Sequence, residues 1–290
     1  PLPTDRPLRI LLFVHGTFSS TLGSYGWLDM TPAGRAFLEA AHREYDVVFG
    51  FDHRSLSERP LENAQQLHEA LAGLPNTAGA PHIDAIGYSR GGLVLRTLVE
   101  QVIPMHDDVP FEIGTCIFVA STHAGTALAS KANVHRLIDT YTNLAVGTCR
   151  GVALIPGATP WAMLASTVLS GLGDIVKDLA EWALEDGGIP GLAAMEPDGD
   201  TVRTLNARLA QDGTVRDYRI VQSTFDVDLA AASAMPGALD SFVSRLKDRV
   251  SDRLMREAND LVVDVESMTR IGNDPARFVK AGEAAQQAFR

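Results

Sequence analysis

Short apolar runs and amphipathic stretches alternate along the first half of the chain. The apolar runs, at residues 8–14, 45–51, 83–86 and 111–121, have the length and composition of buried strands. Helical patterns with one apolar face lie between and after them, at residues 32–43, 60–74 and 93–102. Strands that alternate with helices are typical of βαβ units. The pattern therefore predicts an α/β fold, with a mostly parallel sheet flanked by helices.

The alternation stops in the middle of the chain. No strand candidate occurs from about residue 130 to 210, and residues 151–173 carry no charged side chain. Pro156 and Pro160 interrupt this uncharged stretch, and Gly, Ser and Thr dilute its hydrophobicity, so we predict no transmembrane segment. An amphipathic helix is predicted at residues 174–184. We expect residues 130–210 to form a helical lid inserted into the fold.

The end of the chain returns to the first pattern. Strand character reappears at residues 216–223, a long charged helix is predicted at 239–257, and a loop at 259–267 leads into a further element. We therefore predict a single domain over residues 1–290. Residues 8–129 would form the first half of its core and 211–290 the second half, which we expect to be truncated at its C-terminus.

Composition and charge exclude several classes of function. The 290 residues are 46% hydrophobic, which is sufficient for a large core. There are 25 Lys and Arg residues against 36 Asp and Glu residues, a formal net charge of −11. Such a chain has no overall field that attracts phosphate backbones or anionic headgroups. We therefore expect no binding to nucleic acid or to a membrane surface.

Cysteine and histidine content argue against metal sites. Cys116 and Cys149 are too few for a disulfide framework or a zinc site, and no histidine pair has metal-ligand spacing joined to a carboxylate. We expect no metal and no cofactor. Ordinary thiol usage favours a cytoplasmic location. The start at Pro1, without an initiator methionine, leaves secretion with a removed signal peptide as the alternative.

One sequence motif carries candidate chemistry. Residues 87–91 read Gly-Tyr-Ser-Arg-Gly and match the G-x-S-x-G pattern, in which a sharp strand-to-helix turn exposes the serine. The pattern alone is weak, but here an apolar strand precedes it and an apolar-periodic helix follows it. Ser89 is therefore a candidate nucleophile. The alternative is a glycine-rich turn without chemistry.

A second candidate element follows the first predicted strand. Residues 15–17 read His-Gly-Thr, and this position in the architecture supplies a backbone donor to an oxyanion hole. The backbone N–H groups of Thr17 and Arg90 would converge on a developing alkoxide, and Gly16 would let the backbone approach closely. The alternative is a tight turn in which His15 makes local hydrogen bonds.

Four segments in this order resemble α/β-hydrolases of the lipase and esterase type, close to bacterial lipase-like and PGAP1-like sequences. They are residues 14–17, 87–92, 120–126 and 259–263. A further stretch, 195–206, resembles the lipase segment that closes a lid insertion. The resemblance spans about residues 8–268. It implies an α/β-hydrolase fold and an acyl-ester hydrolase whose helical insertion caps the site.

The resemblance also implies roles for individual residues. Ser89 would be the nucleophile, and Asp260 the acid that orients the catalytic histidine, because residues 259–263 fit the form N-D-x-x-V. Asp226, after the strand at 216–223, is the competing acid, and Asp264 is a third choice.

No histidine stands where the resemblance requires the base. All eight histidines precede Asp260, whereas the order in this fold is Ser, Asp, His. The base would lie beyond Arg290 in a trimmed chain, or His123 or His15 would substitute for it, or it would be absent. The last case leads to a different hypothesis, a catalytically incomplete interaction module of a larger protein that binds a partner without turnover.

The substrate class rests on a weaker signal. The uncharged residues 151–173 suggest a small-molecule or lipid-like ester with an apolar acyl group, although a lid also needs apolar residues to pack on the core. Amide or peptide cleavage by the same triad cannot be separated from ester cleavage by sequence.

Overall fold

The computed structural model describes residues 2–75, 78–130, 133, 189–212, 217–222, 265–272 and 279–280. The predicted helices at 174–184 and 239–257, and most of the predicted lid, lie outside these residues. So do Asp226, Asp260, Asp264 and Cys149.

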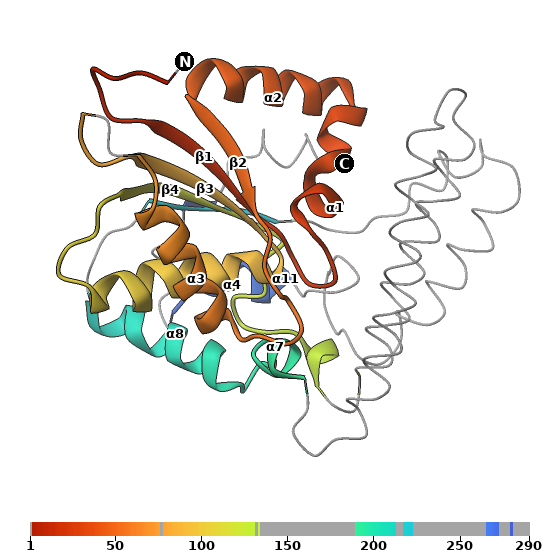
Figure 1. Cartoon of the computed structure of the whole chain (residues 1–290). Helices are drawn as coiled ribbons and strands as arrows, with labels where there is room; N and C mark the ends of the chain where they lie inside the picture. The colour runs from red at the N-terminus through yellow and green to blue at the C-terminus, as the bar shows by residue number, and fades with distance from the viewer. Residues whose placement is uncertain are drawn as a thin grey trace, which may run out of the picture.

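The described strands form one parallel sheet in the order β2-β1-β3-β4-β5-β6 (Figure 1). They are β1 (Arg9–Val14), β2 (Val47–Phe51), β3 (His82–Tyr88), β4 (Glu112–Val119), β5 (Tyr218–Val221) and β6 (Val279–Lys280). The first five confirm the predicted strands, with ends shifted by a few residues. The sixth was not predicted, because its two residues carry no periodicity.

The three helices predicted in the first half of the chain are present, and shorter helical elements that were not predicted accompany them. The described helical elements are α1 (Thr21–Tyr25), η1 (Gly26–Met30), α2 (Pro32–Glu44), α3 (Pro60–Ala72), α4 (Arg90–Thr97), η2 (Leu98–Val102), η3 (Ile103–Met105), η4 (Ala127–Ala129), α7 (Pro190–Ala193), α8 (Asp200–Asp212) and α11 (Val265–Thr269). Both α2 and α3 begin with proline, whose fixed φ suits the first helical turn. The predicted helix at 93–102 starts earlier, at Arg90, and continues into the π-helical turn η2.

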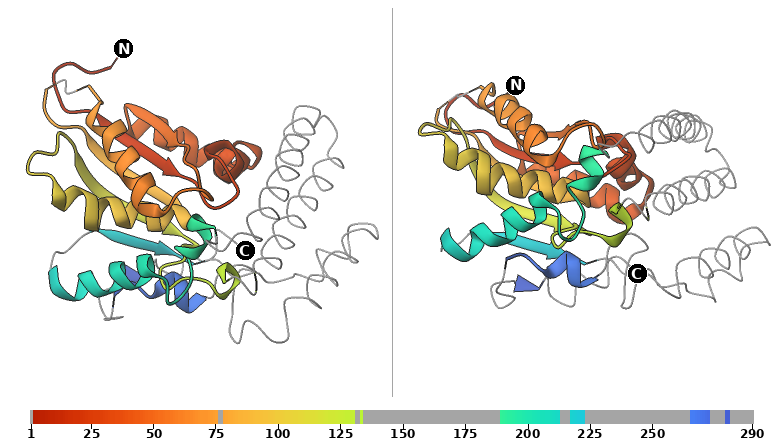
Figure 2. Two further views of the ribbon diagram at one scale, coloured as in Figure 1. Left: turned by 60° about the horizontal axis from the view of Figure 1, so that its bottom comes forward. Right: turned by 90° about the horizontal axis from the view of Figure 1, so that it is seen from below.

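Helices cover both faces of the sheet (Figures 1 and 2). Alternate strand residues point to opposite faces, so Leu11 and Phe13 pack with Ala41 of α2. Ile10 and Leu12 pack on the other face, in the larger cluster that includes apolar residues of α3 and α4. α8 lies in this second helical layer, next to η2. This arrangement of a parallel sheet between helical layers confirms the predicted α/β fold.

Candidate functional site

Ser89 forms the connection between β3 and α4. Its backbone has φ 51° and ψ −121°, a strained conformation for an L-residue. The turn is too tight for a side chain at its glycines, because a Cβ at Gly91 would lie 2.2 Å from the Val14 carbonyl oxygen. A Cβ at Gly87 would lie 2.9 Å from the backbone of Gly91. The sequence motif therefore folds as the sharp strand-to-helix turn that it predicts.

The loop after β1 lies directly against this serine. A Cβ built on Gly16 would be 3.1 Å from Ser89 Cβ and 3.3 Å from the Tyr88 carbonyl oxygen. These contacts are tighter than ordinary van der Waals distance, so glycine permits the close approach. The two candidate segments, far apart in sequence, therefore meet at the carboxyl ends of β1 and β3.

The N–H groups of this loop have different partners. The Gly16 N–H points to Ser24 Oγ at 3.5 Å, and the Phe18 N–H donates to Ser55 Oγ at 3.1 Å. No hydrogen bond among the described residues engages the Thr17 N–H. The Thr17 hydroxyl faces Met195 Sδ at 3.4 Å. Backbone N–H groups on both sides of Thr17 thus contact serine hydroxyls, which hold the loop in place.

The Arg90 N–H is the second candidate donor. Arg90 is the first residue of α4, and the first N–H groups of a helix have no partner within the helix. They also carry the positive end of the helix dipole. In contrast, the Ser89 N–H is bonded to the Val119 carbonyl oxygen at 2.9 Å.

His15 is buried, and both of its ring nitrogens contact backbone groups. Nδ1 lies 2.8 Å from the Gly16 carbonyl oxygen, and Nε2 accepts the His53 N–H at 3.0 Å. These partners require a neutral ring with the proton on Nδ1. Burial lowers the pKa of His15, which favours the same neutral form. Both nitrogens being occupied, the ring has no free atom to act as a base.

His53 stacks on His15 with the ring centroids 4.0 Å apart. Burial, together with the nearby positive charge of Arg90, lowers the pKa of His53 to about 2. The position of His53 beside the loop depends on the pairing of β1 with β2, which the local sequence does not reveal.

His123 is completely buried after β4. Its ring meets Phe118 edge-on at a centroid distance of 4.7 Å, and neither ring nitrogen has a hydrogen-bond partner among the described residues. Burial lowers the pKa of His123 well below its usual value. Neither His15 nor His123 hydrogen-bonds to Ser89 in the described part of the chain.

The candidate acids lie outside the described residues, but the segment that follows Asp260 is anchored near the site. The Ser267 hydroxyl of α11 donates to the Gly125 carbonyl oxygen at 2.5 Å, and the Ala124 N–H donates to the Ser267 carbonyl oxygen at 3.3 Å. α11 is therefore attached to the loop that follows β4.

Asn206 of α8 joins three segments in a way that the sequence did not signal. Its Oδ1 accepts from Arg96 Nη1 and from the Gly272 N–H, both at 3.1 Å. Its Nδ2 donates to the His123 carbonyl oxygen at 3.0 Å. Asn206 thus ties α4 to the loop after β4 and to the chain that follows α11.

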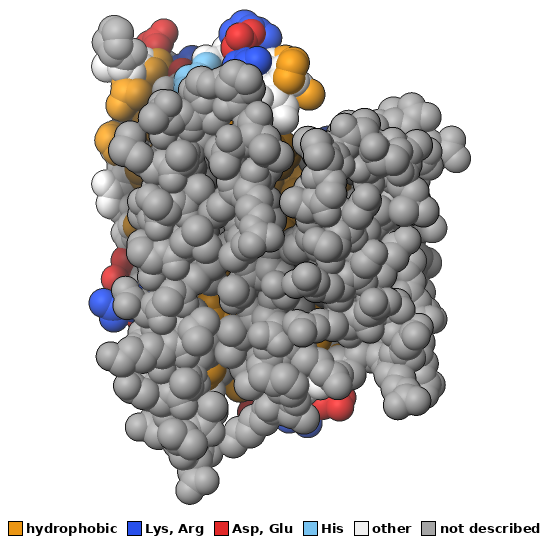
Figure 3. Space-filling model, turned by 90° about the vertical axis from the view of Figure 1, so that its right-hand side faces the viewer, with side chains coloured by type: hydrophobic (Ala, Val, Ile, Leu, Met, Phe, Trp, Pro, Cys, Tyr) orange, Lys and Arg blue, Asp and Glu red, His pale blue; other side chains and the backbone are white. Residues whose placement is uncertain are grey.

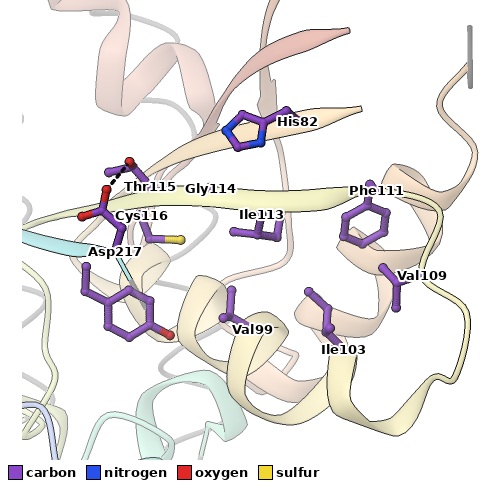
Figure 4. Close-up of a pocket in the computed structure, with 11 residues that line it drawn as sticks. His82, Val99, Ile103, Val109, Phe111, Ile113, Gly114, Thr115, Cys116 and Asp217 are labelled. Atoms are coloured by element: carbon purple, nitrogen blue, oxygen red, sulfur yellow. Dashed lines mark hydrogen bonds between the residues drawn. The ribbon is translucent and has the colours of Figure 1, made fainter. Parts of the chain in front are cut away.

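A cavity of about 480 Å³ lies away from Ser89, between the first half of β4 and the η2–η3 turns (Figure 4). Its lining residues are His82, Val99, Ile103, Val109, Phe111, Ile113, Gly114, Thr115, Cys116, Asp217 and Tyr218. None of these residues belongs to the Ser89 turn or to the loop after β1.

The described residues carry charged side chains of both signs and no cluster of metal-ligating side chains. On the face in Figure 3, their basic and acidic side chains lie beside one another rather than in a patch of one sign. No group of three or more potential metal-ligating side chains occurs among them. None of their helices is long and apolar enough to span a membrane.

The sequence matches one family model over residues 1–288, which is described as a domain of unknown function (DUF7379). The chain belongs to the DUF7379 family. No curated protein matches this DUF7379 chain in sequence.

Solved structures similar to this DUF7379 protein include lipases. Lipase 1 from Pelosinus fermentans has a TM-score of 0.52 and 17% identity, over 93% of this chain and 86% of that one. The mature lipase BlEst2 from Bacillus licheniformis has a TM-score of 0.49 and 15% identity, over 97% and 86%. Phospholipase PlaB from Legionella pneumophila has a TM-score of 0.47 and 15% identity, over 90% and 45%. At these identities the likeness to Lipase 1 supports the α/β-hydrolase fold alone.

Proposed function

We propose that this DUF7379 protein is a serine hydrolase that cleaves carboxylic esters, with Ser89 as its nucleophile. The observation that carries the proposal is the close approach of Gly16 to Ser89, 3.1 Å from a Cβ on Gly16 to Ser89 Cβ. Thr17 directly follows Gly16, and its N–H has no hydrogen-bond partner among the described residues. A strained serine beside two backbone donors is the arrangement that acyl transfer requires.

The proposed reaction has two stages. Ser89 Oγ attacks the carbonyl carbon of the ester while a base takes its proton, and the N–H groups of Thr17 and Arg90 stabilise the oxyanion. The protonated base then gives its proton to the leaving alcohol. Water, activated by the same base, hydrolyses the acyl-enzyme and regenerates the Ser89 hydroxyl.

The acid and the base of the triad are part of the proposal. Asp260 would orient the catalytic histidine, as the bacterial lipase-like and PGAP1-like resemblance implies. The contacts of His15 argue against a direct role as base, because both ring nitrogens are held by the backbone. His123 has free ring nitrogens, but the ring is fully buried. The lid over residues 130–210 and the lipid-like nature of the ester stay predictions.

Ester turnover tests the proposal. The full-length protein should hydrolyse p-nitrophenyl esters, and Ser89→Ala should remove this activity. The exposed serine Ser57 offers a matched control, because Ser57→Ala should leave turnover unchanged. Turnover that survives in Ser89→Ala would contradict the proposal. Hydrolysis of the corresponding p-nitroanilides at a comparable rate would instead show that the enzyme also cleaves amides.

A further inference from the structure

A buried guanidinium lies directly behind the Ser89 turn. The Arg90 side chain has a relative exposure of 0%, and its Nη2 donates to the Glu58 carbonyl oxygen at 2.5 Å. Its Nε and Nη1 atoms are buried, and neither has a hydrogen-bond partner among the described residues. Because arginine stays protonated at neutral pH, this side chain brings a full positive charge into the interior.

No carboxylate among the described residues contacts this charge. Glu58 and Glu62 act on Arg90 only from a distance. The Glu62 carboxylate is paired with Arg59, and the Glu58 carboxylate accepts from Asn63 Nδ2 at 2.6 Å. Both carboxylates are therefore engaged by other side chains, and they compensate the positive charge of Arg90 only in part.

The polar rings beside Arg90 do not compensate it either. His15 and His53 are buried and stacked, and the backbone contacts of His15 require its neutral form. The Arg90 charge itself contributes to keeping the pKa values of both rings low. Of these three buried polar side chains, only Arg90 is charged.

We propose that the Arg90 guanidinium stabilises the negative charge that forms on the substrate oxygen when Ser89 attacks the ester. Arg90 follows Ser89 in the chain, so its backbone N–H and its guanidinium are anchored at the same Cα. A charge in a water-poor surrounding acts over several ångströms with little screening. Burying such a charge without a counter-charge in contact destabilises the folded state, and a residue that only filled space would avoid this cost. This inference rests on the proposed function.

The guanidinium acts on the reaction through space, since its hydrogen bond goes to the Glu58 carbonyl oxygen and no hydrogen bond among the described residues joins it to Ser89. Its contribution is therefore electrostatic rather than a contact with the substrate. A fixed charge that acts only as the oxyanion forms should affect kcat more than KM. It should also affect the binding of an anionic tetrahedral adduct more than the binding of a neutral substrate.

The test compares Arg90→Met, Arg90→Gln and Arg90→Lys in the full-length protein, with Arg59→Met as the exposed control. We expect the two neutral variants to lower kcat by about 10- to 100-fold, with KM changed by less than about threefold. Arg90→Lys keeps the charge and should recover most of kcat. The affinity for an alkyl trifluoromethyl ketone, which forms an anionic adduct with the serine, should fall in parallel with kcat.

The outcomes separate this inference from the proposed function. If Arg90→Met or Arg90→Gln folds and keeps wild-type kcat, the inference is wrong and the ester hydrolase stands. Equal loss in the lysine and glutamine variants, with equal loss of thermal stability, would make Arg90 purely structural and also overturn it. If the wild type shows no Ser89-dependent turnover, the proposed function and this inference fail together.

Discussion

The Nε2 atom of His15 accepts a hydrogen bond from the backbone N–H of His53 at 3.0 Å. This bond joins the loop after β1 to the chain directly after β2. Nδ1 of the same ring contacts the Gly16 carbonyl oxygen and therefore carries the proton. A second proton on Nε2 would place an N–H donor against the N–H of His53, and this hydrogen bond would be lost. The loop that carries Thr17 is thus built on a histidine that must stay neutral.

Stability should therefore fall as the pH falls below about 6.5. The pKa of His53 is about 2 in the folded protein and about 6.5 in an unfolded chain, so the unfolded state binds more protons in this window. We expect His53 to lower the free energy of unfolding by about 2 kcal/mol between pH 7 and pH 5. His15 and His123, whose pKa values are also lowered, act in the same direction.

Urea unfolding at several pH values measures this effect. His53→Phe keeps a ring for stacking and should flatten the pH dependence, whereas a substitution of the exposed His42 by Gln should not. Asp52 Oδ1, 3.9 Å from His15 Nε2, would partly favour a protonated His15. An unchanged slope in His53→Phe would show that His53 is not buried as a neutral ring.

Gly16→Ala should damage activity more than stability. The added Cβ would lie 3.1 to 3.3 Å from Ser89 and Tyr88, so one of them must move by a few tenths of an ångström. We expect kcat/KM to fall by about 10- to 100-fold, with an unfolding free energy within about 1 kcal/mol of the wild type. Gly73→Ala is the matched control, because its Cβ would meet only ordinary contacts at 3.5 Å or more. Full activity in Gly16→Ala would mean that the loop does not serve the serine.

The buried ion pair between Arg96 and Glu100 makes a separate prediction about the fold. Arg96 Nε lies 2.9 Å from Glu100 Oε1, and Tyr218 also donates to this oxygen at 3.0 Å. Glu100→Gln would leave a buried guanidinium without its counter-charge and should lower stability by about 3 to 5 kcal/mol. Glu62→Gln, in an exposed pair with Arg59, should lower it by less than about 1 kcal/mol. Chemical denaturation of both variants checks the difference, and similar values for the two would contradict it.

Much of the fold could be predicted from local sequence. The strands up to residue 121 and the helices α2, α3 and α4 follow from apolar runs and amphipathic spacing, and the turn at Ser89 follows from its flanking glycines. The short helices α1 and η1 were not predicted. The contact of His15 with His53 could not be predicted, because it depends on which strands are neighbours. The same holds for Asn206, whose partners come from segments far away in sequence. The two-residue strand β6 exists only through its pairing with β5.

The acid of the proposed triad can be identified by substitution. Asp260→Asn should lower kcat by about a thousandfold or more, because the histidine would lose the partner that orients it. Asp226→Asn and Asp264→Asn should each leave kcat within about threefold of the wild type. Kinetics of ester hydrolysis compare the three variants. The largest loss in Asp226→Asn would transfer the role of acid to that residue.

Covalent labelling of the full-length protein by a fluorophosphonate tests the central claim most directly. The probe reacts with an activated serine, and the adduct can be located by mass spectrometry of the digested protein. The account predicts one adduct on Ser89, which is lost in Ser89→Ala and kept in Ser57→Ala. An unlabelled wild type, or an adduct on a different serine, would contradict the assignment of Ser89 as the nucleophile.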